Sequence, residues 1–210
     1  MHYPVFLNLA GRACLVVGGG EVALRRARDL LACGATVTVV AESPGAALER
    51  LASRGRVRLE RRPLHDDDAA AAVVVLSATD DRDVNRRLMA IGQRHGKLVN
   101  VYDRPEESSF IYPAVTHRGS LCIAISTGGK SPTMARRIKD DIEARYGPEY
   151  APLLDLLGAM RERIKRRIED PAARREALDR VFTPELLRLL KQGKRKEARA
   201  LSARRAGIAR

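Results

Sequence analysis

Hydrophobic and polar positions follow two different periods along the first hundred residues. Short apolar runs typical of β-strands cover Cys14–Val17, Thr36–Val40, Val57–Arg61, Val73–Ala78 and Leu98–Val101. Segments with helical spacing fill the gaps, at Val22–Cys33, Gly45–Arg54 and Asp81–His95. Strands that alternate with helices predict an α/β fold with a parallel, doubly wound sheet. Ligands of such sheets lie beyond the C-terminal ends of the strands.

After Asp103 the pattern changes. Two short apolar segments, Phe110–Pro113 and Leu121–Ser126, are predicted as strands outside the first sheet, with a turn at Thr116–Gly119 between them. A second glycine-containing loop, Ser126–Pro132, comes next. The remaining chain is predicted to be helical.

The helical part begins with a predicted helix from Thr133 to Tyr146. From Ala151 onward, two prolines at positions 171 and 184 divide the chain into three predicted helices. Apolar residues recur at helical spacing in the first of them, which is typical of a core or a subunit interface.

The first predicted strand ends in three glycines, and a helix follows at once. The spacing Gly18-x-Gly20-x-x-Ala23 matches the dinucleotide-binding fingerprint. Gly18 permits the tight turn, Gly20 lets a pyrophosphate approach the backbone, and Ala23 lets the helix pack closely on the strand. The free N–H groups at the helix N-terminus favour phosphates. A glycine-rich turn of another α/β protein can have the same spacing. The strand–turn–helix context, however, supports the dinucleotide-binding hypothesis.

The second glycine loop resembles the end of a P-loop, at Gly128-Gly129-Lys130-Ser131. The P-loop motif requires a further glycine upstream, where this chain has Ala124. Nucleotide hydrolysis is therefore a disfavoured interpretation of this loop.

Composition narrows the class of protein. The chain has 210 residues and 45% hydrophobic residues, enough for a core, but no apolar run long enough to span a bilayer. Cys14, Cys33 and Cys122 are far apart in apolar surroundings, and we expect small core residues, not a disulfide framework or a metal site. The N-terminus lacks the pattern of a signal peptide. We therefore expect a cytoplasmic protein without a membrane or metal partner.

Positive charge is concentrated in the C-terminal part. The net charge is +13, and residues 151–210 hold 17 Lys and Arg against 8 Asp and Glu. Such a segment can bind nucleic acid, an anionic membrane or a small polyanion, or it can be a solvated surface. Aromatic residues make up only 4% and no DNA-reading motif is present, so nucleic acid is the less favoured partner.

Several sequence motifs occur along the chain in the order and at the spacing typical of one protein family. They are the glycine fingerprint, Ala78–Asn85, Val99–Asp103, Ser108–Ala114 and Ile125–Pro132. With this combination the chain strongly resembles precorrin-2 dehydrogenases, including the N-terminal part of siroheme synthases, over nearly its whole length. The resemblance implies oxidation of precorrin-2 to sirohydrochlorin by NAD⁺ in siroheme biosynthesis. It also implies a homodimer, and some members insert ferrous iron into sirohydrochlorin.

The resemblance implies a division into three parts. Residues 1–112 would form an NAD-binding Rossmann domain with the parallel sheet. Residues 113–147 would form a small central region for dimerisation and the active site. Residues 148–210 would form the basic C-terminal helical region.

The cofactor site is predicted at the strand ends. The fingerprint and the start of the helix would hold the pyrophosphate of NAD, Glu42 with Ser43 would lie near the ribose, and Thr79 with Asp80 would border the nicotinamide. No arginine lies at positions 41–43 to favour a 2′-phosphate, so NAD is preferred over NADP. Helix capping is an equal alternative for Asp80 and Asp81. The predicted cofactor residues are Gly18, Gly19, Gly20, Glu21, Val22, Glu42, Ser43, Thr79 and Asp80.

The predicted catalytic residues are Asp103, His117 and Thr127. Asp103 corresponds to the catalytic aspartate of the family and would take up a proton, although aspartate before Arg104-Pro105 is also a common turn residue. His117 would exchange protons near neutral pH or face solvent in a turn. Thr127 keeps a hydroxyl where the family carries serine.

The predicted substrate-binding residues are Asn100, Ser126, Gly128, Lys130 and Arg136. The cationic side chains among them, with Arg137, would meet the acetate and propionate groups of precorrin-2 and sirohydrochlorin. A solvated helix surface is the alternative for each arginine. Three hypotheses about function remain open here: a dehydrogenase, a dehydrogenase that also inserts ferrous iron, and a non-enzymatic basic protein that senses NAD or binds nucleic acid.

Overall fold

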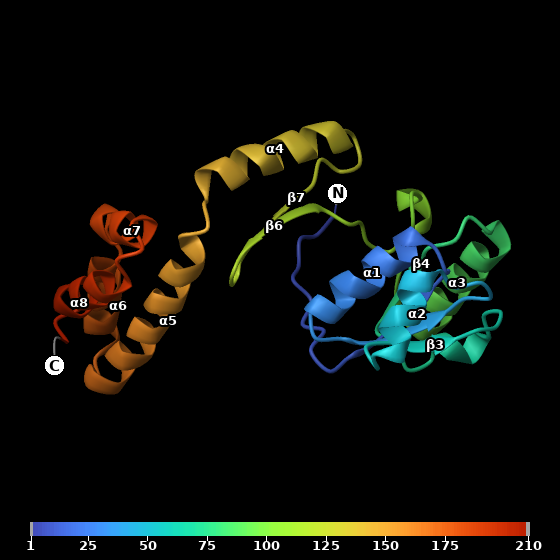
Figure 1. The fold of residues 1–210 in the computed structure, drawn as a ribbon, viewed down its shortest axis with the longest axis horizontal. Coiled ribbons are helices and arrows are strands. Elements are labelled where there is room, and N and C mark those ends of the chain that lie inside the picture. The colour runs from blue at the N-terminus through green and yellow to red at the C-terminus, as the bar shows by residue number, and fades with distance from the viewer. Residues whose placement is uncertain (1, 209–210) are drawn as a thin grey trace. The chain divides into compact units, whose positions relative to one another are not determined.

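The computed structural model describes residues 2–208, and the chain divides into two compact units, residues 1–112 and 113–210 (Figure 1). The first unit holds a five-stranded sheet with the order β3-β2-β1-β4-β5, and every pair in it is parallel. Its strands are β1 (Ala13–Val17), β2 (Thr36–Val40), β3 (Arg58–Glu60), β4 (Val74–Ser77) and β5 (Leu98–Val101). The predicted parallel sheet of the α/β class is therefore confirmed, and the direction of winding reverses between β1 and β4.

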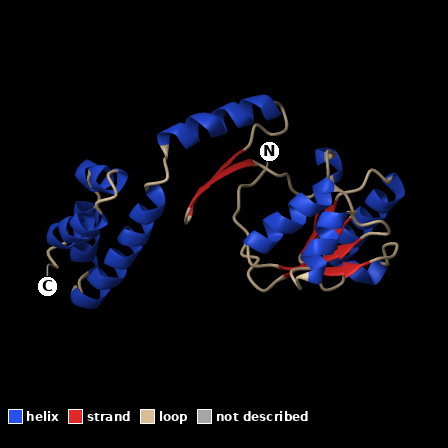
Figure 2. Ribbon diagram, in the orientation of Figure 1, coloured by secondary structure: helices blue, strands red, loops and turns tan. Residues whose placement is uncertain are grey.

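Helices cover both faces of this sheet (Figure 2). On one face, α1 (Glu21–Ala32) and α2 (Ala46–Ser53) pack against strand residues such as Val16 and Val39. On the other face, α3 (Arg82–His95) and the 3-10 helix Asp66–Ala69 pack against the alternate strand residues. The central strands β1 and β4 are nearly continuous apolar runs, as expected where both faces of a strand are buried.

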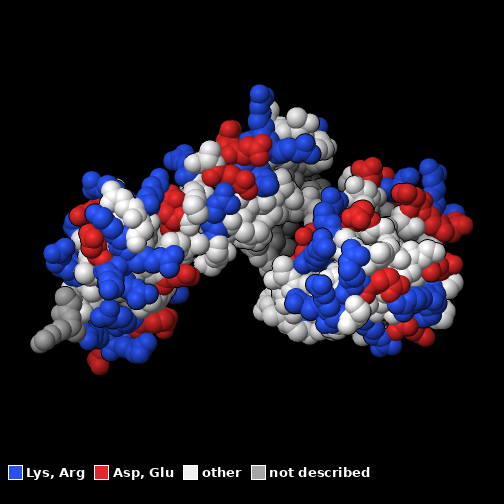
Figure 3. Space-filling model, viewed as in Figure 1, with Lys and Arg blue, Asp and Glu red and all other residues white. Residues whose placement is uncertain are grey.

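The second unit begins with a hairpin and continues as helices. Strands β6 (Ala114–Arg118) and β7 (Leu121–Ile125) pair antiparallel, and α4 (Pro132–Arg145) contacts both. Four helices follow and share one apolar core: α5 (Tyr150–Arg167), α6 (Pro171–Val181), α7 (Pro184–Lys191) and α8 (Arg195–Arg205). Lys and Arg side chains predominate over α6–α8 on the face shown in Figure 3.

The structure corrects the prediction for the first strand of the hairpin. Residues 110–113 are not a strand, and the segment predicted as a turn at 116–119 lies largely in β6. Phe110 and Tyr112 pack against the core of the first unit instead. The guanidinium of Arg26 lies 3.4 Å from the centre of the Tyr112 ring. Burial raises the pKa of Tyr112 to about 12.

Two further predictions differ from the structure. Three helices were predicted after Ala151, but a fourth, α8, begins after Gly193, whose φ of +73° ends the preceding turn. Cys33 is exposed and not a core residue, because it follows the last residue of α1 at the end of the helix. Cys14 is buried, and burial raises the pKa of its thiol.

No helix within residues 2–208 is long and apolar enough to cross a membrane.

Candidate dinucleotide and catalytic site

The glycine turn after β1 packs against the C-terminal ends of the neighbouring strands. Gly18 has a φ of +126°, and its N–H donates to the carbonyl of Val40 at 2.9 Å. A Cβ at this position would lie closer than 3.0 Å to the carbonyl oxygen of Ala78, at the end of β4. A Cβ at Gly19 would collide in the same way with the carbonyl of Ser43, after β2. Neighbouring backbone on two sides therefore excludes side chains from these two positions.

Gly20 differs from its two neighbours because a Cβ there would meet nothing within 4 Å. Gly20 is the N-cap of α1, and within the described residues no side chain caps this helix. The start of α1 thus combines uncapped N–H groups with open space at Gly20, which suits a pyrophosphate. Ala23 is fully buried, so the helix lies close to the sheet. The residues present fit a dinucleotide.

The remaining predicted cofactor residues lie around this edge. Glu21 begins α1 and is exposed, and Val22 beside it is half-buried. Glu42 and Ser43 are exposed directly after β2. The backbone of Gly19 also accepts a hydrogen bond from the N–H of Gly45 at 2.9 Å. The loop after β2 therefore lies against the glycine turn.

The loop after β4 is held by a buried polar pair. Ser77 donates a hydrogen bond to the side chain of Asn85, whose amide donates to the carbonyl of Thr79 at 3.3 Å. Asp81 caps α3 by accepting from the N–H groups of Asp83 and Val84, so capping is confirmed for Asp81. Thr79 is half-buried and accepts a hydrogen bond from the N–H of Asp81, whereas Asp80 is exposed.

Asp103 sits in a strained turn at the end of β5. It is the one non-glycine residue with positive φ, +58°, within residues 2–208. The N–H of Arg104 closes the turn on the carbonyl of Val101 at 3.2 Å. This left-handed conformation is uncommon outside glycine, and such strain persists where surrounding contacts impose it. The carboxylate is exposed at the edge of the sheet where ligands are expected.

Ser108, which the sequence analysis quoted only as part of a family motif, bonds to both sides of this turn, and the neighbouring Ser109 bonds to β5. The hydroxyl of Ser108 accepts from the N–H of Val101 at 2.9 Å and lies 2.7 Å from the carbonyl oxygen of Arg104, to which it donates. The hydroxyl of Ser109 accepts from the N–H of Val99 at 2.7 Å. The paired serines five residues after Asp103 were the signal, since hydroxyls bind backbone groups near turns.

Asn100 is buried, and its side chain is engaged inside the first unit. Its amide donates to the carbonyl of Phe110 at 2.8 Å. This bond draws the chain after the Asp103 turn back against β5. Contact of Asn100 with substrate stays a prediction.

The second glycine loop belongs to the second unit. The hydroxyl of Thr127 accepts from the N–H of Ser131 at 3.1 Å and donates to its carbonyl at 3.1 Å. Ser131 in turn caps α4 by accepting from the N–H of Met134. The N–H of Gly128 donates to the hydroxyl of Ser126 at 3.1 Å. The loop is thus a network of local hydrogen bonds that leads into α4.

The cationic residues of this loop and helix are exposed. Lys130 lies in the loop, and Arg136 and Arg137 lie in the second turn of α4. Within the described residues none of the three makes an ion pair. They are free to meet an anionic ligand.

His117 lies on β6 and not in a turn. It is exposed and stands opposite Cys122 of β7, with its Nε2 atom 3.9 Å from the sulfur. The two predicted catalytic residues of the second unit therefore lie on different elements, His117 on β6 and Thr127 in the loop after β7. The described chain holds no cluster of three or more His, Cys, Asp or Glu side chains suited to a metal ion.

Three family models match the chain. An NAD(P)-binding family matches residues 5–114, which is half of the chain. The central region of sirohaem biosynthesis proteins matches residues 118–145, and the dimerisation region of sirohaem synthases matches residues 149–205. The dimerisation model therefore lies on helices α5–α8.

Curated relatives and a solved structure agree with these models. The chain is 39% identical to siroheme synthase of Methylococcus capsulatus over 94% of its own length and 42% of the relative. It is 37% identical to siroheme synthase of Pseudomonas aeruginosa over 97% of its length and 44% of the relative. The chain thus spans less than half the length of these relatives. A solved structure, "SirC, precorrin-2 dehydrogenase", is 31% identical, with a TM-score of 0.79, over 93% of this chain and 98% of that one.

Proposed function

The chain belongs to the precorrin-2 dehydrogenase family, which includes the N-terminal part of siroheme synthases, and we propose that it oxidises precorrin-2 to sirohydrochlorin with NAD⁺. The likeness to SirC over 98% of that chain carries the proposal. The glycine turn supports it, because the open space at Gly20 and the start of α1 suit a pyrophosphate.

The proposed reaction removes two hydrogens from precorrin-2, one as a hydride and the other as a proton. A bound nicotinamide would supply the hydride acceptor, and a base would remove the proton as a new double bond forms in the macrocycle. We assign the base to Asp103, whose exposed carboxylate is held at the ligand edge of the sheet by the Ser108 network. The residues of the second glycine loop and α4, with Lys130 and Arg136, would bind substrate carboxylates.

NAD is the proposed cofactor in preference to NADP. Glu42 is exposed directly after β2, where an acidic side chain accepts hydrogen bonds from the ribose hydroxyls and repels a 2′-phosphate. Glu42→Gln should therefore lower the preference for NAD⁺ over NADP⁺ in kcat/KM by about tenfold, which is roughly one lost charge-assisted interaction. An unchanged ratio would remove Glu42 from the ribose site.

We further propose a cytoplasmic homodimer. The match of residues 149–205 to a dimerisation region supports the assembly. Sedimentation at two or more protein concentrations tests it, and a monomer at every concentration would overturn it.

An anaerobic assay with precorrin-2 and NAD⁺ tests the activity by following NADH and the sirohydrochlorin spectrum. Asp103→Asn should lower kcat by at least about 100-fold, as expected for a lost general base. Asparagine tolerates positive φ, so the turn should survive. Glu106→Gln, in the same loop, is the matched control and should stay within about twofold. Equal activity of both variants would exclude Asp103 as the base.

Ferrous iron added after the first step separates the two enzymatic alternatives. Conversion of sirohydrochlorin to siroheme faster than without protein would assign a second activity. Absence of that conversion would limit the protein to dehydrogenation. Absence of NADH with folded protein would refute the proposed function.

A further inference from the structure

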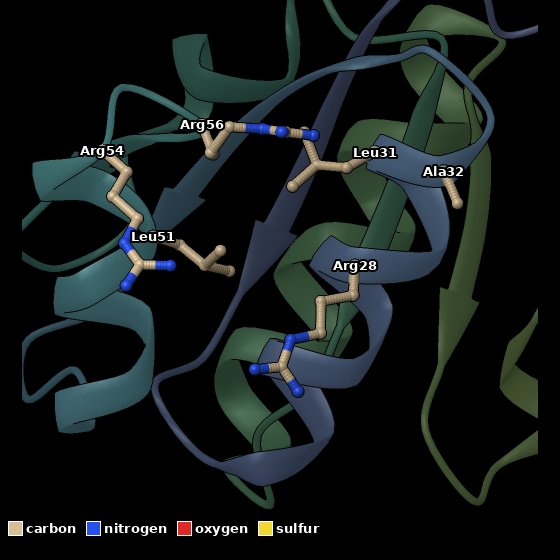
Figure 4. A pocket seen from close by; sticks show the side chains of 6 residues that line it. All are labelled: Arg28, Leu31, Ala32, Leu51, Arg54 and Arg56. Atoms are coloured by element: carbon tan, nitrogen blue, oxygen red, sulfur yellow. The ribbon is translucent and has the colours of Figure 1, made fainter.

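A basic groove lies between α1 and α2, at the helix ends opposite to the glycine turn (Figure 4). Its volume is about 370 Å³. Three arginines and three apolar residues line it: Arg28, Leu31, Ala32, Leu51, Arg54 and Arg56. Arg28 lies seven residues beyond the start of α1, about 10 Å along the helix axis. The groove is therefore separate from the site described above.

The end of α2 arranges two of these arginines. Gly55 has a φ of +65° and donates its N–H to the carbonyl of Ala52 at 2.9 Å, while the N–H of Arg56 donates to the carbonyl of Leu51 at 3.0 Å. This pair of bonds is a Schellman motif, which reverses the chain at a defined point. Arg54 and Arg56 consequently lie on either side of Leu51, and Arg28 approaches from α1 (Figure 4).

The three guanidinium groups have no counter-charge. Within the part of the chain that the structure describes, Arg28, Arg54 and Arg56 make no ion pair and no side-chain hydrogen bond. The next two arginines along the chain behave differently, since Arg58 pairs with Glu60 and Arg61 with Glu49. Three like charges around one depression repel one another, and an anion between them removes that repulsion.

A second groove of the first unit differs in the charges of its lining. That groove has about 320 Å³ and mixes charges, because Arg86 is accompanied by Glu106 and Glu107. The groove between α1 and α2 has no acidic residue in its lining, and its uncharged lining residues are all apolar. Guanidinium groups bind carboxylates and phosphates through paired hydrogen bonds, and leucine side chains bind apolar surface.

We propose that this groove binds a small organic polyanion, with two or more carboxylate or phosphate groups on an apolar body. The anionic groups contact Arg28, Arg54 and Arg56, and the apolar body covers Leu31 and Leu51. The proposal does not depend on the reaction proposed above, since no residue of the groove belongs to that site.

Calorimetric titration of the full chain tests the proposal, with NAD⁺ present in excess to occupy the dinucleotide site. The probes are benzene-1,3,5-tricarboxylate and benzene-1,3-diyl bis(phosphate), which each carry at least two anionic groups on an apolar ring and separate carboxylate from phosphate recognition. At least one probe should bind at one saturable site per chain. The R54Q/R56Q variant should raise the Kd of that probe at least tenfold.

The matched control is R94Q/R175Q, which removes two exposed, unpaired arginines elsewhere and should change the Kd less than twofold. Methyl NMR shifts of Leu31 and Leu51 should move on titration, which locates the ligand. Circular dichroism should show the same fold for both variants, because all four substituted residues are exposed. Equal weakening in both variants, or no saturable binding of either probe to the unchanged chain, would overturn the proposal.

Discussion

Gly18 and Gly19, after β1, are crowded by neighbouring backbone, whereas Gly128 and Gly129, after β7, face open space. Both turns use positive φ, at Gly18 in the first and at both glycines in the second. The first turn is joined to the ends of β2 and β4, so a change there must disturb the sheet. The second is held by the hydroxyl bonds of Thr127 and Ser131, so a change there should stay local.

Gly18→Ala should have the largest effect of the changes that test this difference. Its Cβ would collide with the carbonyl of Ala78 at a φ that alanine rarely adopts. We expect the free energy of unfolding of the first unit to fall by about 3 kcal/mol or more, measured by urea denaturation.

Gly20→Ala is the control for that variant, because its Cβ meets nothing and its φ is −86°. Stability should change by less than about 0.5 kcal/mol, while NAD⁺ affinity falls because the methyl group occupies the open surface. Equal stability of Gly18→Ala and Gly20→Ala would show that backbone crowding does not define the first turn.

Tyr112 supplies a test of how firmly the end of the first unit is anchored. Burial raises its pKa from 10 to about 12, so the folded state keeps a proton that the unfolded state loses above pH 10. The stabilisation is complete below pH 10 and is lost as the pH rises to about 12, by up to about 2–3 kcal/mol.

Urea denaturation at pH 9 and pH 11.5 measures this loss. Tyr112→Phe should reduce the pH dependence, whereas Tyr3→Phe, at an exposed position, should not. The same pH dependence in all three chains would contradict the buried position of Tyr112.

Thr127 tests the hydrogen bonds of the second glycine loop. Thr127→Val removes both bonds to Ser131, so hydrogen exchange of the Ser131 amide should accelerate about tenfold, which corresponds to about 1.4 kcal/mol. Thr127→Ser keeps the hydroxyl and should leave exchange nearly unchanged. Similar rates in both variants would mean that the hydroxyl does not hold the loop.

Gly128→Ala should have the smallest effect. The methyl group has free space, and the cost is the positive φ of +63°, about 1 kcal/mol confined to the second unit. NAD⁺ affinity should remain unchanged in calorimetry. A loss as large as that of Gly18→Ala would remove the contrast between the two turns.

Periodicity predicted all five strands and the three helices of the first unit to within one residue. It failed at Phe110–Pro113 because apolar residues at that spacing suit a strand and a packed connection equally well. The contacts of Phe110 and Tyr112 with the core, and the bond from Asn100 to Phe110, decide the outcome. These partners are distant in sequence or belong to a different element, so no local pattern contains them.

The sequence by itself determined the strand–glycine turn–helix unit, the parallel sheet and the order of the family motifs, because these depend on local propensity and on side-chain periodicity. Only the tertiary structure decided that Ser108 bonds to both sides of the turn in which Asp103 has a positive φ. It alone decided that Arg28, Arg54 and Arg56 meet in one groove without a carboxylate. The physical reason is that turns and grooves take their geometry from contacts between separate elements, and those contacts exist only once the elements have packed.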